Sequence, residues 1–228
     1  MKQVKFGNRL LNVNLNSEAD KSVFYEIFEA RDYKILDEIM KNAKWPILDL
    51  GAHIGLFSLY ASVLNPLVKI LTFEPEENNF GSLKKNFKLN KINNVIAKNV
   101  AVSSKEGEVV LNLSEDSHNH SLVQVDDYFI GEKKVQCTTL EKIFEKNRVE
   151  KCTLIKMDVE GAEFDILENL PSEIFSKIQN FYIEYHEYSS EMNPQKLIQI
   201  LQKNGFKVQS KKSSYDKRFG FIFARAGF

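Results

Sequence analysis

Two stretches of this sequence place acidic residues directly after a short apolar strand. The first reads ILDLGAHIGLFSLY from Ile47, and the second reads IKMDVEGAEFDIL from Ile155. Parallel strands bring their carboxyl ends to one edge of a sheet, so Asp49, Asp158 and Glu160 are expected at that edge. Carboxylates in such a place can bind a polar ligand, or orient a hydroxyl group and take its proton.

The glycines after the first of these strands, Gly51 and Gly55, allow a sharp turn and a close approach of the backbone to a ligand. The helix that follows offers free N–H groups. The spacing is G-x-x-x-G instead of the G-x-G-x-x-G of dinucleotide sites, and His53 and Ile54 are bulky where a pyrophosphate would lie. An acid before the glycines favours a ligand with a cationic group, such as the amino-acid end of S-adenosylmethionine. A plain tight turn between strand and helix explains the glycines equally well.

The next two strands also end in polar residues. Glu74 ends the second strand, where a carboxylate can accept hydrogen bonds from both hydroxyls of a ribose, and Pro75 orients the loop that follows. Asn99 ends the third strand, and its amide can hydrogen-bond an adenine, with Val100 or Ala101 against the face of the base. A surface Glu beside a turn and an Asn within a turn are the simpler interpretations.

The elements that must position these residues follow a simple order. The chain has 228 residues, 43% hydrophobic and 27% charged, as in an ordinary globular protein. Short strands that are apolar on both faces alternate with helical patterns, which predicts an α/β fold with a parallel sheet covered by helices on both sides. Only the last two strands, 206–210 and 220–224, are close enough for a hairpin, so one antiparallel strand is expected in the sheet. We predict one domain over 1–228, with a hairpin and helices in 1–45 and the core in 46–228.

The alternation of strands and helices breaks between residues 100 and 138. Strands are predicted at 101–102 and 108–113, around a turn at 105–107, and they form an inserted β-hairpin. A helix follows from Leu140, opened by a capping box that pairs Thr138 with Glu141.

Several motifs together resemble the FkbM family of S-adenosylmethionine-dependent methyltransferases. They are DLGAHIGLFS, FEPEENNF, NVAVSSKEGEVVLNL, TTLEKIF and above all IKMDVEGAEFDIL, in the family's order and at its spacing over roughly residues 26–186. The resemblance implies a Rossmann-like class I methyltransferase fold with a mostly parallel seven-stranded sheet. It also implies O-methylation of a sugar, polyketide or similar small molecule. The sequence departs from the family at His53, where Asn is common, which leaves the role of that side chain open. The implied cofactor-binding residues are Asp49, Gly51, Ala52, His53, Gly55, Glu74, Pro75, Asn99, Val100, Ala101 and Asp158.

Methyl transfer to oxygen needs an oriented acceptor and a group that takes the hydroxyl proton. Asp158 is the leading candidate, since the resemblance places it beside the sulfonium methyl group, and Glu160 follows it closely. His186, after the fifth strand, can act as a general base near neutral pH. Together with Glu184 and Glu187, Asp158 and His186 could instead bind a divalent metal, which we do not expect here. Solvent-tolerant acids and a loop-capping His are the plainer alternative.

Four further features of the sequence concern the surroundings of this site. Glu163, early in a helix, is interpreted as an acid favoured by the helix dipole. Lys156 is unusual in a central strand and is expected to pair with an acid or to reach the sheet edge. The loop 114–121 is a candidate lid, with His118, Asn119, His120 and Ser121 in it, and Tyr25, Glu26 and Tyr33 are expected to wall the pocket.

Charge and composition exclude some functions. The 31 basic and 31 acidic residues cancel, whereas nucleic-acid binders usually show a basic excess. The fourth strand is not followed by the Asn/Asp-Pro-Pro motif of enzymes that methylate base amino groups. Cys137 and Cys152 lie in apolar runs as buried thiols, and no run of about 18 apolar residues occurs, so we expect a cytoplasmic protein without a membrane segment. The rival functions are a non-catalytic S-adenosylmethionine-binding module and a nicotinamide oxidoreductase. The identity of the acceptor and the oligomeric state stay open.

Overall fold

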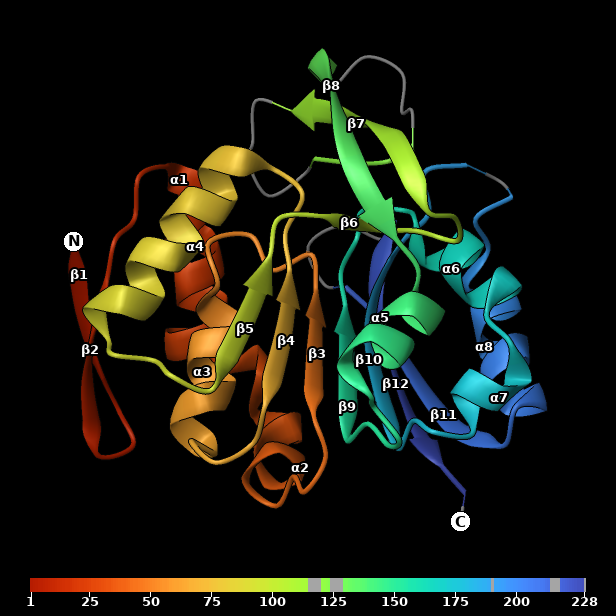
Figure 1. The fold of residues 1–228 in the computed structure, drawn as a ribbon, viewed down its shortest axis with the longest axis horizontal. Coiled ribbons are helices and arrows are strands. Elements are labelled where there is room, and N and C mark those ends of the chain that lie inside the picture. Colours follow the sequence, from red (N-terminus) through yellow and green to blue (C-terminus); the bar gives the residue numbers. More distant parts are fainter. Residues whose placement is uncertain (115–119, 124–128, 190, 214–217, 228) are drawn as a thin grey trace.

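The computed structural model describes residues 1–114, 120–123, 129–189, 191–213 and 218–227. Its centre is a seven-stranded sheet with the order β11-β12-β10-β9-β3-β4-β5 (Figure 1). The strands in that order are β11 (Phe206–Lys212), β12 (Phe219–Ala226), β10 (Asn180–His186), β9 (Leu154–Met157), β3 (Ile47–Leu50), β4 (Ile70–Phe73) and β5 (Val95–Lys98).

The predicted mixture of strand directions is confirmed. Strands β10, β9, β3, β4 and β5 pair in parallel, while β12 is antiparallel to both β10 and β11. Parallel neighbours need crossover segments, which here are helices. They are α3 (Leu56–Leu64), α4 (Glu77–Leu89), α5 (Leu140–Asn147), α6 (Glu163–Asn169), α7 (Ser172–Phe175) and α8 (Pro194–Lys203).

Two apolar cores cover the two faces of the sheet, as the doubly apolar strands require. In β3, Ile47 packs into the cluster that holds α3 and α4, whereas Leu48 packs into the cluster that holds α5 to α8. In β9, Leu154 and Ile155 divide in the same way, which is the period of two expected for strands.

The N-terminal segment packs on the α3–α4 side. The hairpin predicted within residues 1–45 is confirmed as β1 (Lys2–Phe6) and β2 (Arg9–Val13), which turn at Gly7. Asn86 of α4 and the C-cap of that helix, Asn90, accept hydrogen bonds from the backbone N–H groups of residues 14 and 12 and so attach β2 and the residue after it to the core. The chain continues through α1 (Glu18–Phe24), a π-helix (Tyr25–Ala30), a 3-10 helix (Asp32–Leu36) and α2 (Asp37–Lys41).

The insertion differs from the predicted one. The hairpin consists of β7 (Gly107–Ser114) and β8 (Phe129–Thr138), and β6 (Ala101–Val102) pairs in parallel with β8 instead of with the strand that follows it. The strand β8 takes the middle place because Val135 and Cys137 bury themselves against Leu111 and Ala101. Figure 1 shows this hairpin above the carboxyl ends of β3, β4 and β5.

The predicted start of α5 at Leu140 is confirmed, but the predicted N-cap, Thr138, is wrong by one residue. Thr139 is the N-cap, and its hydroxyl accepts the N–H of Lys142, whereas Thr138 still pairs with Val102 in the sheet. A residue whose backbone is paired in a sheet cannot also cap a helix, so Thr139, the next residue, is the N-cap of α5. Among the helices of the described residues, none is long and apolar enough to cross a bilayer.

Candidate active site

A cavity of about 970 Å³ lies at the carboxyl edge of the sheet. Its walls are the π-helix and 3-10 helix of the N-terminal segment, the loops after β3, β4 and β5, the ends of β9 and β10, and one face of β11 and β12. Tyr25, Glu26 and Tyr33 line it, as the sequence predicted.

Most of the predicted cofactor residues meet in this cavity. Those that line it are Gly51, Ala52, His53, Glu74, Pro75, Val100, Ala101 and Asp158. Asp49, Gly55 and Asn99 are not part of its wall. The Asn99 amide group donates to the backbone oxygens of Glu74 and Pro75, at 2.9 Å each, so it holds the loop after β4.

The glycine loop has three residues in the left-handed region, Gly51 (φ +74°), His53 (φ +50°) and Gly55 (φ +83°). A Cβ on Gly51 would lie 1.7 Å from the backbone oxygen of Asp158. A Cβ on Gly55 would lie 2.9 Å from side-chain atoms of Leu83 and Phe87. Gly51 is therefore required by the neighbouring strand end β9, in addition to any approach to a ligand that the sequence suggested.

Glu74 is buried, and its carboxylate organises the glycine loop. It accepts the backbone N–H of His53 at 2.7 Å and that of Glu76 at 2.9 Å. Burial raises its pKa to about 8. The His53 ring itself turns toward α1, where its Nε2 lies 3.3 Å from the carboxylate of Asp20. A side chain whose role the sequence left open thus connects the loop to the N-terminal segment.

Asp49 and Lys156 form a buried ionic network under the glycine loop. The Ser58 hydroxyl donates to Asp49 Oδ2 at 2.6 Å, and Lys156 Nζ lies 3.7 Å from Asp49 Oδ1. Lys156 also donates to the Gly51 carbonyl at 2.9 Å and to Asp158 Oδ2 at 3.2 Å. Burial works to lower the pKa of Lys156, but Asp158 and Asp49 together raise it, so the ammonium stays charged. The prediction that Lys156 pairs with an acid is confirmed.

His186 lies between two carboxylates at the end of β10. Its Nδ1 is 3.2 Å from Glu163 Oε1, and its Nε2 is 3.4 Å from Glu160 Oε2. The Tyr188 hydroxyl donates to the same oxygen of Glu160. Burial would lower the pKa of His186, yet Glu160 and Glu163 raise it well above its usual value. Burial raises the pKa of Glu160 to about 7.

Glu163 is the residue of this cluster that sequence reasoning missed. The sequence predicts an acid at the start of a helix, and Glu163 does lie in the first turn of α6, but its side chain is fully buried and has a second role. Besides facing His186, it accepts the backbone N–H of Val159 at 3.2 Å. The close spacing of Glu160 and Glu163 in the sequence was a usable signal, whereas the left-handed backbone of Glu160, with φ of +53°, is known only from the structure.

Asp158, Glu160 and His186 can each present one ligand atom to a metal ion, and these atoms lie within 4.8 Å of one another. The set that the sequence proposed contained Glu184 and Glu187 instead of Glu160. In the structure Glu187 pairs with Lys212, at 3.1 Å, and Glu184 lines the cavity.

The β12 strand presents half-buried aromatic residues to the cavity. Phe219, Phe221 and Phe223 line it, while the residues between them are buried on the helix side. On β10, Tyr182, Glu184 and His186 line it in the same way. One face of this half of the sheet is therefore open to a ligand, whereas the other face is covered by helices.

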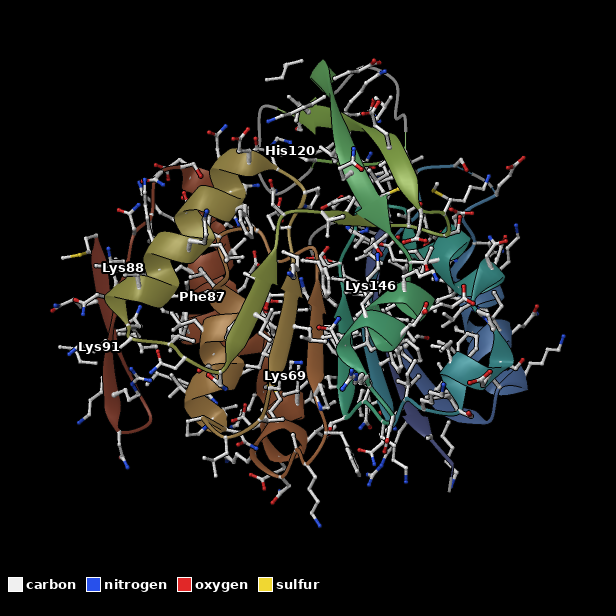
Figure 2. All side chains as sticks on the ribbon, viewed as in Figure 1. Lys69, Phe87, Lys88, Lys91, His120 and Lys146 are labelled. Carbon is white, nitrogen blue, oxygen red and sulfur yellow. The ribbon has the colours of Figure 1, made fainter. Side chains whose placement is uncertain are left out.

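The candidate lid is described only in part, because His118 and Asn119 lie outside the described residues. Figure 2 shows His120 near the β7–β8 hairpin, and its side chain lines the cavity. Ser121 is buried, and its hydroxyl donates to the backbone oxygen of Glu160. Ser121 thus supports the strained turn at Glu160.

Comparison with known proteins agrees with this arrangement. The sequence model of the methyltransferase FkbM domain matches residues 49–208. Methyltransferase sdnD of Sordaria araneosa is 28% identical over 249 residues, which cover 91% of this chain and 95% of that protein. Methyltransferase 1 of Beauveria bassiana is 25% identical over 181 residues, 71% of this chain and 72% of that protein.

The fold has a solved counterpart. The crystal structure of methyltransferase FkbM from Methylobacillus flagellatus KT superposes with a TM-score of 0.55 at 15% identity. The match covers 79% of this chain but only 43% of that one. Since the FkbM domain extends over more than half of the sequence, this chain belongs to the FkbM family and is an S-adenosylmethionine-dependent methyltransferase.

Proposed function

We propose that this enzyme transfers the methyl group to a hydroxyl oxygen of a small molecule or carbohydrate. The observation that carries the proposal is the cluster of Asp158, Glu160 and His186 on one wall of the cavity, beside the glycine loop. A carboxylate and an imidazole together can orient a hydroxyl group and accept its proton.

We assign the cofactor to the part of the cavity between the loops after β3 and β4. S-adenosylmethionine supplies an electrophilic methyl group on a sulfonium sulfur when it is bound. The buried carboxyl group of Glu74 would hydrogen-bond the two ribose hydroxyls, and Val100 and Ala101 would lie against the adenine. Asn99 would act indirectly and not on the adenine itself, because it is not part of the cavity wall and its NH₂ group holds the loop after β4.

The remaining predicted cofactor residues have supporting roles in this proposal. Asp49 would act indirectly, by holding Lys156 and through it the Gly51 carbonyl. Gly51 and Ala52 would leave room for the ligand, His53 would fix the loop through Asp20, and Pro75 would shape the loop after β4. Gly55 would serve through its tight packing against Leu83 and Phe87.

The proton of the acceptor hydroxyl is assigned to the His186 cluster. The Glu163 carboxylate contacts His186 Nδ1, which fixes the orientation of the imidazole ring and directs its Nε2 toward Glu160. Asp158 would orient the hydroxyl group, while its own position is held by Lys156. Glu160 would receive the proton and not His186 as the sequence also allowed, because His186, with its pKa raised well above the usual value despite burial, already holds one. Tyr188 keeps the Glu160 carboxylate in place.

We propose that the transfer needs no metal. Before its Nε2 could bind a metal together with Asp158 and Glu160, His186 would have to give up a proton that Glu160 and Glu163 stabilise, since they raise its pKa well above the usual value despite burial. The hydrogen bond from Tyr188 to Glu160 and the contact between His186 and Glu163 already satisfy these groups without a metal.

Three further expectations remain part of the proposal. The whole chain acts as one domain, which the hydrogen bonds between β2 and α4 support. The compartment is the cytoplasm, supported by two buried free thiols, Cys137 and Cys152. The acceptor is not a nucleic acid, because the 31 basic residues are balanced by 31 acidic ones.

Binding and transfer test the proposal separately. Calorimetric titration with S-adenosylhomocysteine should show micromolar binding, and titration with NAD should show none. An acceptor screen with a labelled methyl donor should then find hydroxyl compounds as methyl acceptors. Asp158→Ala should abolish the transfer and change the affinity for S-adenosylhomocysteine by less than several-fold. Binding without transfer to any acceptor would favour the non-catalytic alternative, and binding of NAD alone would favour an oxidoreductase.

A further inference from the structure

One carboxylate in the cavity has no partner in the protein. Glu184 forms no hydrogen bond and no ion pair within the described part of the chain, although it lines the cavity. It follows Ile183, which pairs with Met157, so Glu184 lies beside Asp158 at the end of β9. A carboxylate so close to the site of transfer and without a partner calls for a ligand group.

The nearby cations are already committed to other acids. Lys156 is shared between Asp49 and Asp158, at 3.7 and 3.2 Å. His186 lies between Glu160 and Glu163. Lys211 lies on the same face of the sheet but two strands away, roughly 10 Å at the usual strand spacing. Glu184 thus has no ion-pair partner among the described residues. Burial together with Asp158 raises the pKa of its carboxyl group well above the usual value, so that a bound cation would be needed to favour its charged form.

Aromatic rings surround this carboxylate. Phe221 lies directly opposite Glu184 in the β10–β12 pair, and its ring stacks on Tyr182 with centroids 5.8 Å apart. Tyr33 packs against Tyr182 at 5.4 Å. The hydroxyls of Tyr33 and Tyr182, like Glu184, have no hydrogen-bond partner among the described residues, and all three side chains line the cavity. Aromatic faces and a carboxylate are the groups that bind organic ammonium ions in proteins.

We propose that Glu184, Tyr33, Tyr182 and Phe221 form a subsite for a protonated amine on the methyl acceptor. The amine donates to the Glu184 carboxylate and to a tyrosine hydroxyl, and its carbon neighbours pack on the rings. Because Glu184 is next to Asp158, the methylated hydroxyl lies within a few bonds of the amine. This inference rests on the proposed function, since it assigns the acceptor side of the same cavity, and it narrows the acceptor to an amino alcohol.

A matched pair of probes tests the subsite without knowledge of the natural acceptor. Benzylammonium and benzyl alcohol have the same shape and differ in charge. We expect the protein saturated with S-adenosylhomocysteine to bind benzylammonium about tenfold more tightly than benzyl alcohol, as measured by calorimetry. Glu184→Gln keeps the shape and removes the charge, so the preference should fall below about twofold. Glu187→Gln, on an acid that pairs with Lys212 near the same strand end, should leave the preference unchanged.

Two outcomes would overturn the inference. Equal binding of the two probes to the natural protein would remove the amine subsite. A loss of more than tenfold in S-adenosylhomocysteine affinity in Glu184→Gln would assign Glu184 to the cofactor's own ammonium instead. If that variant does not fold, Phe221→Leu provides the second test, since it removes a half-buried ring and should also reduce the preference. Failure of S-adenosylhomocysteine to bind at all would refute the proposed function. This result comes from the titration with S-adenosylhomocysteine alone, so it is distinguished from a failure of the amine subsite, which appears only when the two probes are compared.

Discussion

Replacing Gly51 with alanine should separate two reasons for a glycine in this loop, the left-handed backbone and the close contact with the end of β9. Gly51 and Gly55 have similar left-handed backbones, φ +74° and +83°. An alanine at either position therefore carries the same conformational cost of about 1–2 kcal/mol. The difference lies in what the new methyl group meets.

At Gly51 the methyl group meets backbone. It would lie 1.7 Å from the Asp158 oxygen, and the N–H of Asp158 is bonded to the Leu50 oxygen at 3.1 Å, so the end of β9 must move away from β3. We expect overpacking against backbone to add about 2–3 kcal/mol, the upper part of the usual range, for a total of about 3–5 kcal/mol. The same movement displaces Asp158 and the Lys156 ammonium, which donates to the Gly51 oxygen. The affinity for S-adenosylhomocysteine and the methyl transfer should both fall by more than tenfold.

At Gly55 the methyl group meets the side chains of Leu83 and Phe87, at 2.9 Å, which can shift. Gly55→Ala should cost about 2–3 kcal/mol and leave Asp158 in place. Urea unfolding gives the two stabilities, and titration with S-adenosylhomocysteine gives the two affinities. Equal destabilisation of the two variants, with natural affinity in Gly51→Ala, would refute the assignment of Gly51 to the β9 contact.

Three other changes test single parts of the site. Lys156→Met leaves Asp49 buried without its cation and should destabilise the protein by about 3–5 kcal/mol in urea unfolding. Adding Asp49→Asn to this variant should restore part of the lost stability. Strictly additive losses from the two substitutions would argue against an ion pair between Lys156 and Asp49. Glu74 keeps its proton up to about pH 8 in the folded protein but loses it near pH 4.5 in the unfolded chain. The ligand-free protein should therefore lose up to about 4 kcal/mol of stability as the pH rises from 4.5 to about 8. Glu74→Gln should lack that slope in thermal unfolding at a series of pH values, and an identical slope in both proteins would contradict it. Treatment with EDTA followed by gel filtration should leave the methyl transfer unchanged, whereas loss of activity that Mg²⁺ restores would show that a metal is needed.

Much of the fold could be predicted because it depends on local pattern. The strands β3, β4 and β9 are short runs of residues that are buried on both faces, and such runs signal a parallel sheet without knowledge of any contact. The edge that carries the ligand follows from strand direction alone, which is why Gly51, Glu74 and Asp158 could be assigned to one cavity wall. The family resemblance added the cofactor.

Contacts between distant segments could not be predicted in this way. The strand β8 enters between β6 and β7 because Val135 and Cys137 bury apolar surface there, and pairing order is not encoded in either segment by itself. The Asn99 amide was expected to face a base, but the loop after β4 uses its donors. A polar side chain takes the partners that the packed chain offers, and those are visible only after folding.

The sequence by itself determined which residue types stand at the carboxyl edge, because strand ends and glycine turns have local signatures. Only the tertiary structure decided how the charges are shared there. Lys156 pairs with Asp49 and Asp158, and His186 lies between Glu160 and Glu163. Glu184 therefore has no ion-pair partner among the described residues. Pairing between charges depends on distances of a few ångströms across strands that are far apart in the chain, since Coulomb energies in a buried site fall steeply with separation and exposure.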